Sequence, residues 1–137
     1  IISGGGVITQ NHEQYENVIR DITRRGGRVE VIGMQCHIGE EMTDPAQMWR
    51  VIDRFSRFGV PIHATEFDVN TDNEAVQSAY TRDFVTAWFA HPATESFTMW
   101  GFWEGQHWIP RAALYRRDWT PKPNAVAFEE LVTKRWR

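Results

Sequence analysis

Cysteine is nearly absent from this sequence, which holds Cys36 alone among 137 residues. One cysteine excludes an internal disulfide and any metal cluster built from several thiolates. A basic excess is also lacking, because 15 Lys and Arg stand against 18 Asp and Glu. The resulting formal charge of -3 argues against a surface built to hold nucleic acid or an anionic membrane. No apolar run approaches the roughly 20 residues that span a bilayer, so we expect no membrane partner.

The sequence starts without Met and shows no signal or transit segment, so we expect it to come from within a longer polypeptide. Apolar material is plentiful, since 42% of the residues are hydrophobic and 13% aromatic. This composition favours a packed core over a disordered chain, and the length suits one domain, residues 1–137. Seven tryptophans are many for 137 residues. Some will fill the core, and exposed ones can stack on flat ligands such as sugars.

Helix and strand patterns alternate along the chain. Apolar residues at helical spacing predict four helices, over residues 11–26, 44–59, 73–91 and from 124 onwards. Short β-rich apolar runs between them predict buried strands over 29–37, 61–69 and 97–102. This alternation indicates an α/β fold with parallel strands and right-handed crossovers. Either a small doubly wound sheet or part of a (β/α)8 barrel fits. A complete barrel is excluded because it needs about 250 residues.

Residues that favour helix N-termini stand where the first three helices should begin. Asn11 is followed three residues later by Gln14, the spacing of a capping box. Asp44 precedes Pro45, the order of an N-cap and a proline at the first helical position. Asn73 can cap the third helix. We therefore expect these three side chains to accept hydrogen bonds from the first helical turns.

Polar residues gather at the carboxyl ends of the three predicted strands, the edge where chemistry collects in parallel sheets. The first strand ends with Gln35 and His37, and the second carries Glu66 and Asp68. The third runs into Trp-Gly-Phe-Trp-Glu at 100–104. Strand periodicity puts Glu66 and Asp68 on one face about 6.6 Å apart. His37, from the neighbouring strand, can then bridge the two carboxylates by hydrogen bonds.

Two other interpretations of these residues stay open. Glu66 and Asp68 can be solvated loop residues beside a buried, hydrogen-bonded histidine, although three adjacent polar strand ends favour a site. A metal site is the second alternative, because histidines and carboxylates are ligand types. However, His63 lies three residues before Glu66, so alternation sends it to the opposite face. We therefore expect neither a metal nor a cofactor.

Several segments also match the strand motifs of one enzyme family, in the same order and spacing. Residues 61–69 (Pro-Ile-His-Ala-Thr-Glu-Phe-Asp-Val) match an Ile-x-x-Thr-Glu-Leu-Asp strand, and 32–37 (Ile-Gly-Met-Gln-Cys-His) a Gly-x-Gln-x-His strand. Residues 99–110 match a Trp-Gly segment with a second tryptophan in the following loop. Tyr115 and Thr-Pro-Lys-Pro at 120–123 match the approach to the final helix. Together the chain resembles family 10 of the glycoside hydrolases, the xylanases, over nearly its whole length.

The resemblance implies the C-terminal part of a (β/α)8 barrel. Its activity would be cleavage of internal β-1,4 bonds of xylan with retention of anomeric configuration and without a cofactor. Glu66 falls on the family's nucleophile, and His37 and Asp68 fall on the pair that hydrogen-bonds and orients it. Gln35 falls on a polar active-site residue.

Substrate contacts follow from the same resemblance. Trp100 and Trp108 fall on the tryptophans that line the glycone side of the cleft, and we expect Glu104 to join them in binding substrate. The expected partner is xylan or a xylo-oligosaccharide. The size of xylan implies an extracellular protein.

One part of the family's machinery is missing. The general acid/base sits on an earlier strand, in a Trp-Asp-Val-Val-Asn-Glu type of segment, and nothing like it occurs in these 137 residues. Glu40 and Glu41, after the first strand, are the spare carboxylates near the right rim. We therefore expect a fragment that carries the nucleophile half of the site and is inactive alone. The alternative is a non-catalytic glycan-binding barrel that keeps the cleft tryptophans.

Two further expectations follow from the fragment. In the tryptophan loop, Trp103, Glu104 and His107 stand where many family members have smaller or different polar residues. A partial barrel also exposes two parallel sheet edges, and such edges invite self-association.

Overall fold

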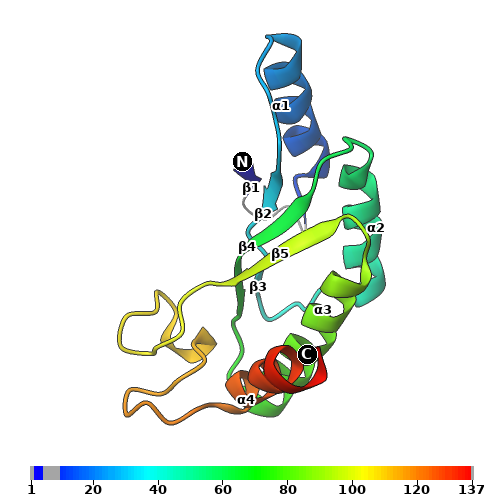
Figure 1. Ribbon diagram of the computed structural model, residues 1–137. Coiled ribbons are helices and arrows are strands. Elements are labelled where there is room, and N and C mark those ends of the chain that lie inside the picture. Colours follow the sequence, from blue (N-terminus) through cyan, green and yellow to red (C-terminus); the bar gives the residue numbers. More distant parts are fainter. Residues whose placement is uncertain (1, 5–9, 137) are drawn as a thin grey trace.

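The computed structural model describes residues 2–4 and 10–136, a parallel sheet flanked by helices (Figure 1). The strands are β1 (Ile2–Gly4), β2 (Ile32–Met34), β3 (His37–Ile38), β4 (Ile62–Val69) and β5 (Thr94–Met99). Each observed pairing is parallel: β1 with β2, and β4 with β2, β3 and β5. The strands expected from the sequence are therefore neighbours in sequence order, as predicted. β1 was not predicted from the sequence, because a three-residue strand carries no periodic signal.

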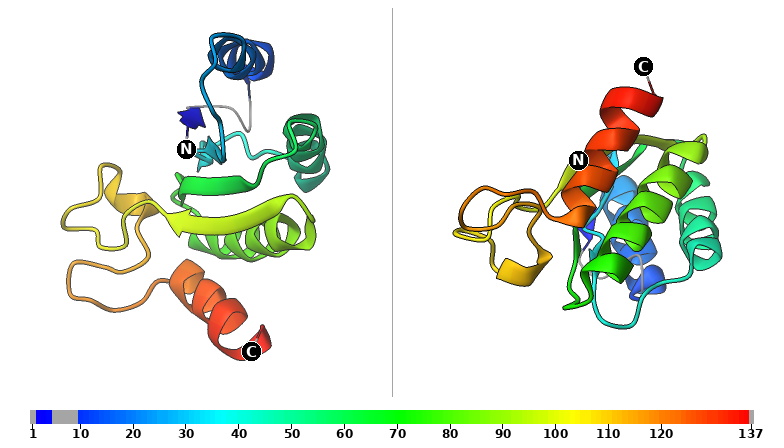
Figure 2. Two further views of the ribbon diagram at one scale, coloured as in Figure 1. Left: turned by 45° about the horizontal axis from the view of Figure 1, so that its top comes forward. Right: turned by 90° about the horizontal axis from the view of Figure 1, so that it is seen from below.

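The helices are α1 (His12–Arg24), α2 (Pro45–Ser56), α3 (Glu74–Ala90) and α4 (Pro123–Glu130). All four were expected from the apolar spacing. A 3-10 turn, Pro110–Ala112, precedes α4, and a π-helical turn, Leu131–Arg135, follows it. Figure 2 shows the helices along the outer side of the sheet. None of the helices in the described residues is long and apolar enough to cross a bilayer.

Two of the three expected helix caps are present. Asp44 accepts a hydrogen bond from the backbone N–H of Ala46 at 2.8 Å, and Asn73 accepts one from Val76 at 3.1 Å. The expected capping box at Asn11 is wrong, since Asn11 has a φ of 61° and its side chain makes no cap hydrogen bond. A capping side chain reaches the helix from an extended backbone, which the left-handed conformation of Asn11 does not provide.

Two strands differ from their predicted boundaries. The predicted strand over 29–37 begins only at Ile32 and is interrupted at Gln35 and Cys36, and buried Cys36 has a φ of 61°. The last strand is Thr94–Met99 instead of 97–102. It ends early because the chain turns at Gly101, whose φ of 69° is a conformation that glycine tolerates best.

The hydrophobic core lies between the sheet and the helices. Its large fully buried side chains include Phe67 of β4 and Phe84 and Trp88 of α3. The Phe67 and Phe84 ring centroids are 4.7 Å apart, and the Trp88 indole N–H donates to the Ser96 carbonyl at 3.1 Å. Burial of each such ring contributes about 1.5–3 kcal/mol, so this core fixes α3 against β4 and β5.

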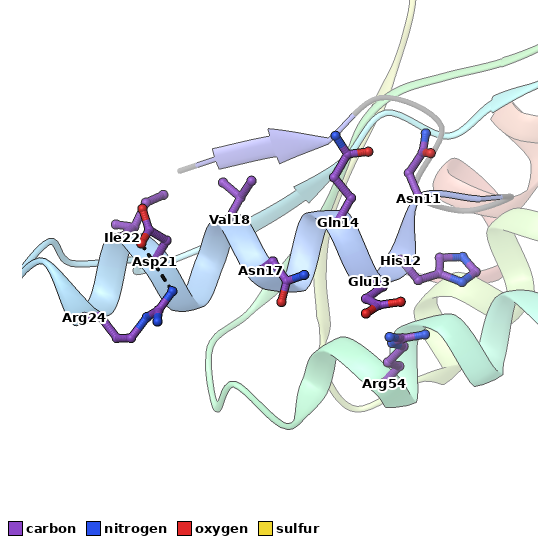
Figure 3. A pocket seen from close by; sticks show the side chains of 10 residues that line it. All are labelled: Asn11, His12, Glu13, Gln14, Asn17, Val18, Asp21, Ile22, Arg24 and Arg54. Carbon is purple, nitrogen blue, oxygen red and sulfur yellow. Dashed lines mark hydrogen bonds and ion pairs between the residues drawn. The ribbon is translucent and has the colours of Figure 1, made fainter.

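A surface hollow runs along α1 and is lined by side chains from Asn11 to Arg24 together with Arg54 of α2 (Figure 3). Arg54 also ties the two helices together through hydrogen bonds of 2.9 and 3.0 Å to the Glu16 carboxylate. None of the residues predicted for the active site lines this hollow.

Candidate active site

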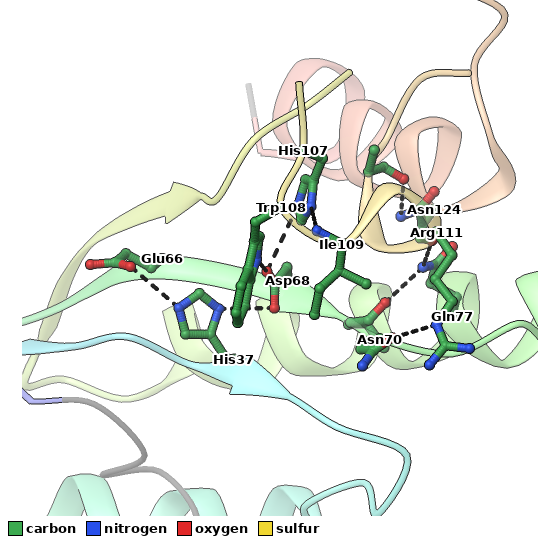
Figure 4. A network of polar contacts seen from close by, with 12 residues as sticks. His37, Glu66, Asp68, Asn70, Gln77, His107, Trp108, Ile109, Arg111 and Asn124 are labelled. Atoms are coloured by element: carbon green, nitrogen blue, oxygen red, sulfur yellow. Dashed lines mark hydrogen bonds and ion pairs between the residues drawn. The ribbon is translucent and has the colours of Figure 1, made fainter. Parts of the chain in front are cut away.

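The predicted catalytic side chains converge at the carboxyl ends of β3 and β4 (Figure 4). His37 comes from β3, and Glu66 and Asp68 come from β4. Trp108 approaches from the loop that follows β5. The fold thus brings together residues that are far apart in sequence. His37 and Trp108, for example, are separated by 71 positions.

β4 contains a bulge at the level of the site. Met34 pairs with Ala64, whereas His37 pairs with Asp68, so residues 65–67 of β4 stand opposite only 35–36. The pairing with β5 shifts at the same place, between Ala64 and Phe67. β-Bulges occur often beside active sites, where they re-aim side chains. Here the bulge contains Glu66.

The bulge explains the burial pattern of β4. An unbroken strand would send every second residue into the core. The β4 residues that join the core instead show an interval of three in the middle: Ile62, Ala64, Phe67 and Val69. Glu66 and Asp68, two residues apart beyond the extra residue, therefore share the face that points away from the core.

The bulge also overturns the predicted placement of His63. Because of the extra residue, His63 lies on the same face of β4 as Glu66, not on the opposite one. Their contacts are nevertheless separate, since His63 Nε2 lies 3.1 Å from a carboxylate oxygen of Glu95 and Glu66 contacts His37. Among the residues that the structure describes, no three His, Cys, Asp or Glu side chains gather as metal ligands.

His37 bridges the two carboxylates. Its Nδ1 lies 3.0 Å from Oδ1 of Asp68, and its Nε2 lies 3.3 Å from Oε2 of Glu66. The hydrogen bond to Asp68 is the main cause that raises the pKa of His37, and the charge of Asp68 and the contact with Glu66 add to it against the opposing effect of burial. When both nitrogens are protonated, the ring donates to both carboxylates.

Asp68 is the buried centre of the cluster, with 2% of its side chain exposed. Its Oδ2 accepts a hydrogen bond of 2.8 Å from the indole N–H of Trp108. The same oxygen lies 3.8 Å from Nε2 of His107, beyond hydrogen-bond distance. A buried carboxylate is costly unless it is paired, and His37 and Trp108 supply that compensation.

Two exposed indole rings flank His37. Trp100 is 44% exposed and Trp108 is 61% exposed. Their ring centroids lie 6.2 Å and 5.1 Å from that of His37. Indole faces can stack on the apolar faces of sugar rings, and these two stand beside the histidine that contacts Glu66.

The described contacts place the remaining predicted residues outside the network of His37, Glu66, Asp68 and Trp108. Gln35 is half-buried at the break between β2 and β3. The Glu104 carboxylate accepts a hydrogen bond of 3.3 Å from the Arg117 backbone, so it lies outside the His37 network. Exposed Glu40 has an oxygen 3.4 Å from Nη2 of Arg111.

Sequence reasoning did not assign a role to His107 or Gly101. The His107 side chain is fully buried, and its ring packs so closely on Gly101 that a Cβ there would lie 2.6 Å from Cδ2. A glycine next to Trp100 and a histidine next to Trp108 were the available signals, but neither indicates that the two residues touch.

Comparisons with known proteins agree with these motifs. The model of glycosyl hydrolase family 10 matches residues 7–132. Anti-sigma-I factor RsgI6 of Acetivibrio thermocellus is 32% identical over 111 residues, which cover 80% of this chain and 14% of that protein. Endo-1,4-beta-xylanase 3 of Arabidopsis thaliana is 36% identical over 92 residues, 67% of this chain and 12% of that protein.

A solved structure extends the comparison to the fold. Xylanase 10B from Thermotoga petrophila, in complex with xylobiose, aligns with a TM-score of 0.84 at 23% identity. The alignment covers 97% of this chain and 46% of that chain, so this chain spans less than half of the related structure. The sheet and its helices are therefore part of a (β/α)8 barrel, as the sequence predicted.

Proposed function

The chain belongs to glycosyl hydrolase family 10, and we propose that it supplies the nucleophile half of the active site of a retaining endo-1,4-β-xylanase. The observation that carries this proposal is the position of His37, whose two ring nitrogens contact Glu66 and Asp68. This arrangement suits a nucleophile, because Glu66 is held by a hydrogen bond while 22% of its side chain stays open to solvent.

Retention of configuration proceeds through two displacements. An oxygen of ionised Glu66 attacks the anomeric carbon, and the glycosidic oxygen leaves with a proton from a general acid about 5–5.5 Å away. Water then hydrolyses the glycosyl-enzyme bond. Protonated His37 donates its Nε2–H to Glu66, which fixes the rotamer of the carboxylate. Oδ1 of Asp68 contacts Nδ1, the other ring nitrogen of His37.

Substrate binding follows from the residues around Glu66. Trp100 and Trp108 provide faces on which xylose rings stack, and the indole N–H of Trp108 is already engaged by Asp68. Gln35 and Glu104 are the proposed hydrogen-bond partners of sugar hydroxyls.

The general acid/base comes, in this proposal, from outside the 137 residues. Glu40 and Glu41 follow β3, the strand beside the nucleophile, whereas the acid must approach from the other side of the sugar. General acid catalysis typically contributes 10²–10⁴-fold, and the missing wall of the cleft removes substrate positioning as well. The chain alone should therefore not hydrolyse xylan. Residual activity on activated aryl xylosides that disappears in Glu66→Gln fits a nucleophile without its acid, whereas robust hydrolysis of xylan would contradict this assignment.

Covalent labelling tests the nucleophile directly. A 2-fluoroxylobioside with a dinitrophenyl leaving group needs no acid to form its covalent intermediate, and it is applied to a complete barrel that contains this chain. Mass spectrometry of the peptides should find the sugar on Glu66, and Glu66→Gln should abolish the adduct. Glu95→Gln is the matched control, because Glu95 also contacts a histidine, His63 of β4, but lies outside the cluster. An adduct on another residue would refute the proposal.

A second candidate is a glycan-binding domain that has lost catalysis. The observation in its favour is the similarity to RsgI6, whose name describes an anti-sigma-I factor. The two candidates differ at the position of the general acid in the complete barrel. Binding of xylo-oligosaccharides without turnover, together with a non-acidic residue at that position, would favour the binding domain.

Xylan is the proposed partner in both cases, and its size places the proposed site of action outside the cell. Self-association is a further proposal, because β1 and β5 are unpaired on their outer sides among the described strands. Analytical ultracentrifugation of the chain should detect a dimer or larger species. A stable monomer would contradict self-association.

A further inference from the structure

The ring of His107 is buried and packs closely against Gly101. Its side chain is fully buried, and its ring lies against Gly101 at a distance that leaves no room for a Cβ. Gly101 also has a φ of 69°, which side-chain-bearing residues rarely adopt. Both the close contact with the ring of His107 and the backbone conformation therefore favour glycine at position 101.

The backbone determines which nitrogen of His107 carries the proton. The N–H of Ile109 donates to Nδ1 at 3.0 Å, so Nδ1 is an acceptor. Burial is the main cause that lowers the pKa of His107, which favours the neutral ring. A neutral imidazole with an accepting Nδ1 carries its proton on Nε2. Its Nε2–H is therefore a donor.

This donor faces Asp68. Nε2 lies 3.8 Å from Oδ2 of Asp68, as the dashed line in Figure 4 marks. Among the described residues, no group makes a hydrogen bond to Nε2, and Asp68 is a charged neighbour rather than a hydrogen-bond partner. Besides burial, the charges of Asp68 on β4 and His37 on β3 and backbone hydrogen bonding with Trp100 and Ile109 act on the pKa of the ring. A buried donor without a partner is costly, and a nearby carboxylate reduces that cost.

His91 shows the same arrangement elsewhere in the molecule. The N–H of Ala93, two residues later, donates to Nδ1 of His91 at 3.1 Å. Nε2 of His91 lies 3.1 Å from Oδ1 of Asp53, within hydrogen-bond distance. In both cases a backbone N–H selects the tautomer, and Nε2 is aimed at a carboxylate.

We propose that His107 is a positioning residue that acts through Asp68: its Nε2–H, 3.8 Å from Oδ2, favours by charge–dipole attraction the orientation of the Asp68 carboxylate in which Oδ1 contacts His37. This inference rests on the proposed function only in its consequence, that His37 in turn holds Glu66. His107, Asp68, His37 and Glu66 then form one chain of contacts from the loop after β5 to the proposed nucleophile. Trp108 anchors the same oxygen of Asp68 that His107 faces.

Two amide substitutions distinguish the acceptor role of Nδ1 of His107 from the donor role of Nε2. In His107→Asn the amide oxygen can replace Nδ1, but the donor toward Asp68 is lost. In His107→Gln the amide N–H can reach the position of Nε2, so the donor is kept. His91→Asn is the matched control, because it removes the same type of donor from a buried histidine remote from the site.

The readout is the titration of His37, followed by NMR of the ring protons in the 137-residue chain. We expect the proton-binding constant of His37 to fall at least threefold in His107→Asn. Without the Nε2–H, the Asp68 carboxylate is held at Oδ2 by Trp108 alone and keeps less of the hydrogen bond that raises the pKa of His37. His107→Gln should stay within twofold of wild type, and so should His91→Asn. If His107→Asn fails to fold, His107→Leu compared with His107→Gln gives the same contrast.

An unchanged His37 titration in the folded variant without the donor would overturn this role. So would an equal change in His91→Asn, since that would indicate a general loss of packing. The result is independent of the labelling experiment, because the titration requires no activity. Labelling of Glu66 can succeed while the His37 titration does not change, or the reverse, so the two proposals fail separately.

Discussion

Nδ1 of His37 lies 3.0 Å from Oδ1 of Asp68, although 31 residues separate the two in sequence. The two residues are direct partners in the pairing of β3 with β4. Asp68 has 2% of its side chain exposed, so His37 and Trp108 compensate the cost of burying this carboxylate. The relationship therefore links the stability of the fold to the ionisation of the proposed site.

Asp68→Asn should reduce stability in a pH-dependent way. The pKa of His37 is raised in the folded protein, so its stabilising contribution is complete below the unfolded pKa of about 6.5 and is lost as the pH rises through the folded pKa. We expect a loss of about 3 kcal/mol in the free energy of unfolding at about pH 6, and a smaller loss at about pH 9. Urea unfolding at the two pH values measures this difference. An equal loss at both would contradict the linkage.

Trp108→Phe should be more damaging to stability than Trp100→Phe. Both changes keep an aromatic face, but only the first removes the N–H that Asp68 accepts at 2.8 Å. A hydrogen bond to a charged group contributes about 1.5–3 kcal/mol, so we expect a loss of about 2 kcal/mol for Trp108→Phe. Chemical unfolding of the two variants side by side gives the comparison. Equal losses would show that the indole N–H does not stabilise Asp68.

Cys36 should tolerate glycine better than valine. Its φ of 61° is in the left-handed region, where glycine is unstrained and a β-branched residue is a genuine outlier. We expect Cys36→Val to destabilise the fold by about 1–3 kcal/mol more than Cys36→Gly. Thermal or urea unfolding measures the difference. The opposite ranking would indicate that packing of the buried side chain outweighs backbone conformation.

The Cys36 thiol should be unreactive in the folded protein. It is buried, burial raises its pKa, and the thiolate is the reactive form. At about pH 8 a disulfide reagent should react slowly under native conditions and at once in denaturant. Rapid native reaction would indicate that the segment between β2 and β3 opens.

Much of the site could be predicted because its residue types are local in sequence. Glu66 and Asp68 lie two apart on one predicted strand, and His37 ends the predicted strand beside it, so parallel pairing is enough to expect the three together. The contact of Trp108 with Asp68 spans 40 residues and depends on the path of an irregular loop. Nothing in the spacing of apolar residues encodes that path, so this contact was not predicted. The resemblance placed Trp108 in the cleft without giving it a partner.

The sequence by itself determined the alternation of helices and strands, because apolar spacing reports which side of each element is buried. It also determined that polar side chains end three neighbouring strands. Only the tertiary structure decided the bulge in β4, which puts His63 on the same face as Glu66, and the break at Cys36, which separates β2 from β3. The physical reason is that both depend on how backbone hydrogen bonds align between strands far apart in sequence. A local hydrophobic pattern carries no information about that alignment, and the same holds for the buried contact between Gly101 and His107.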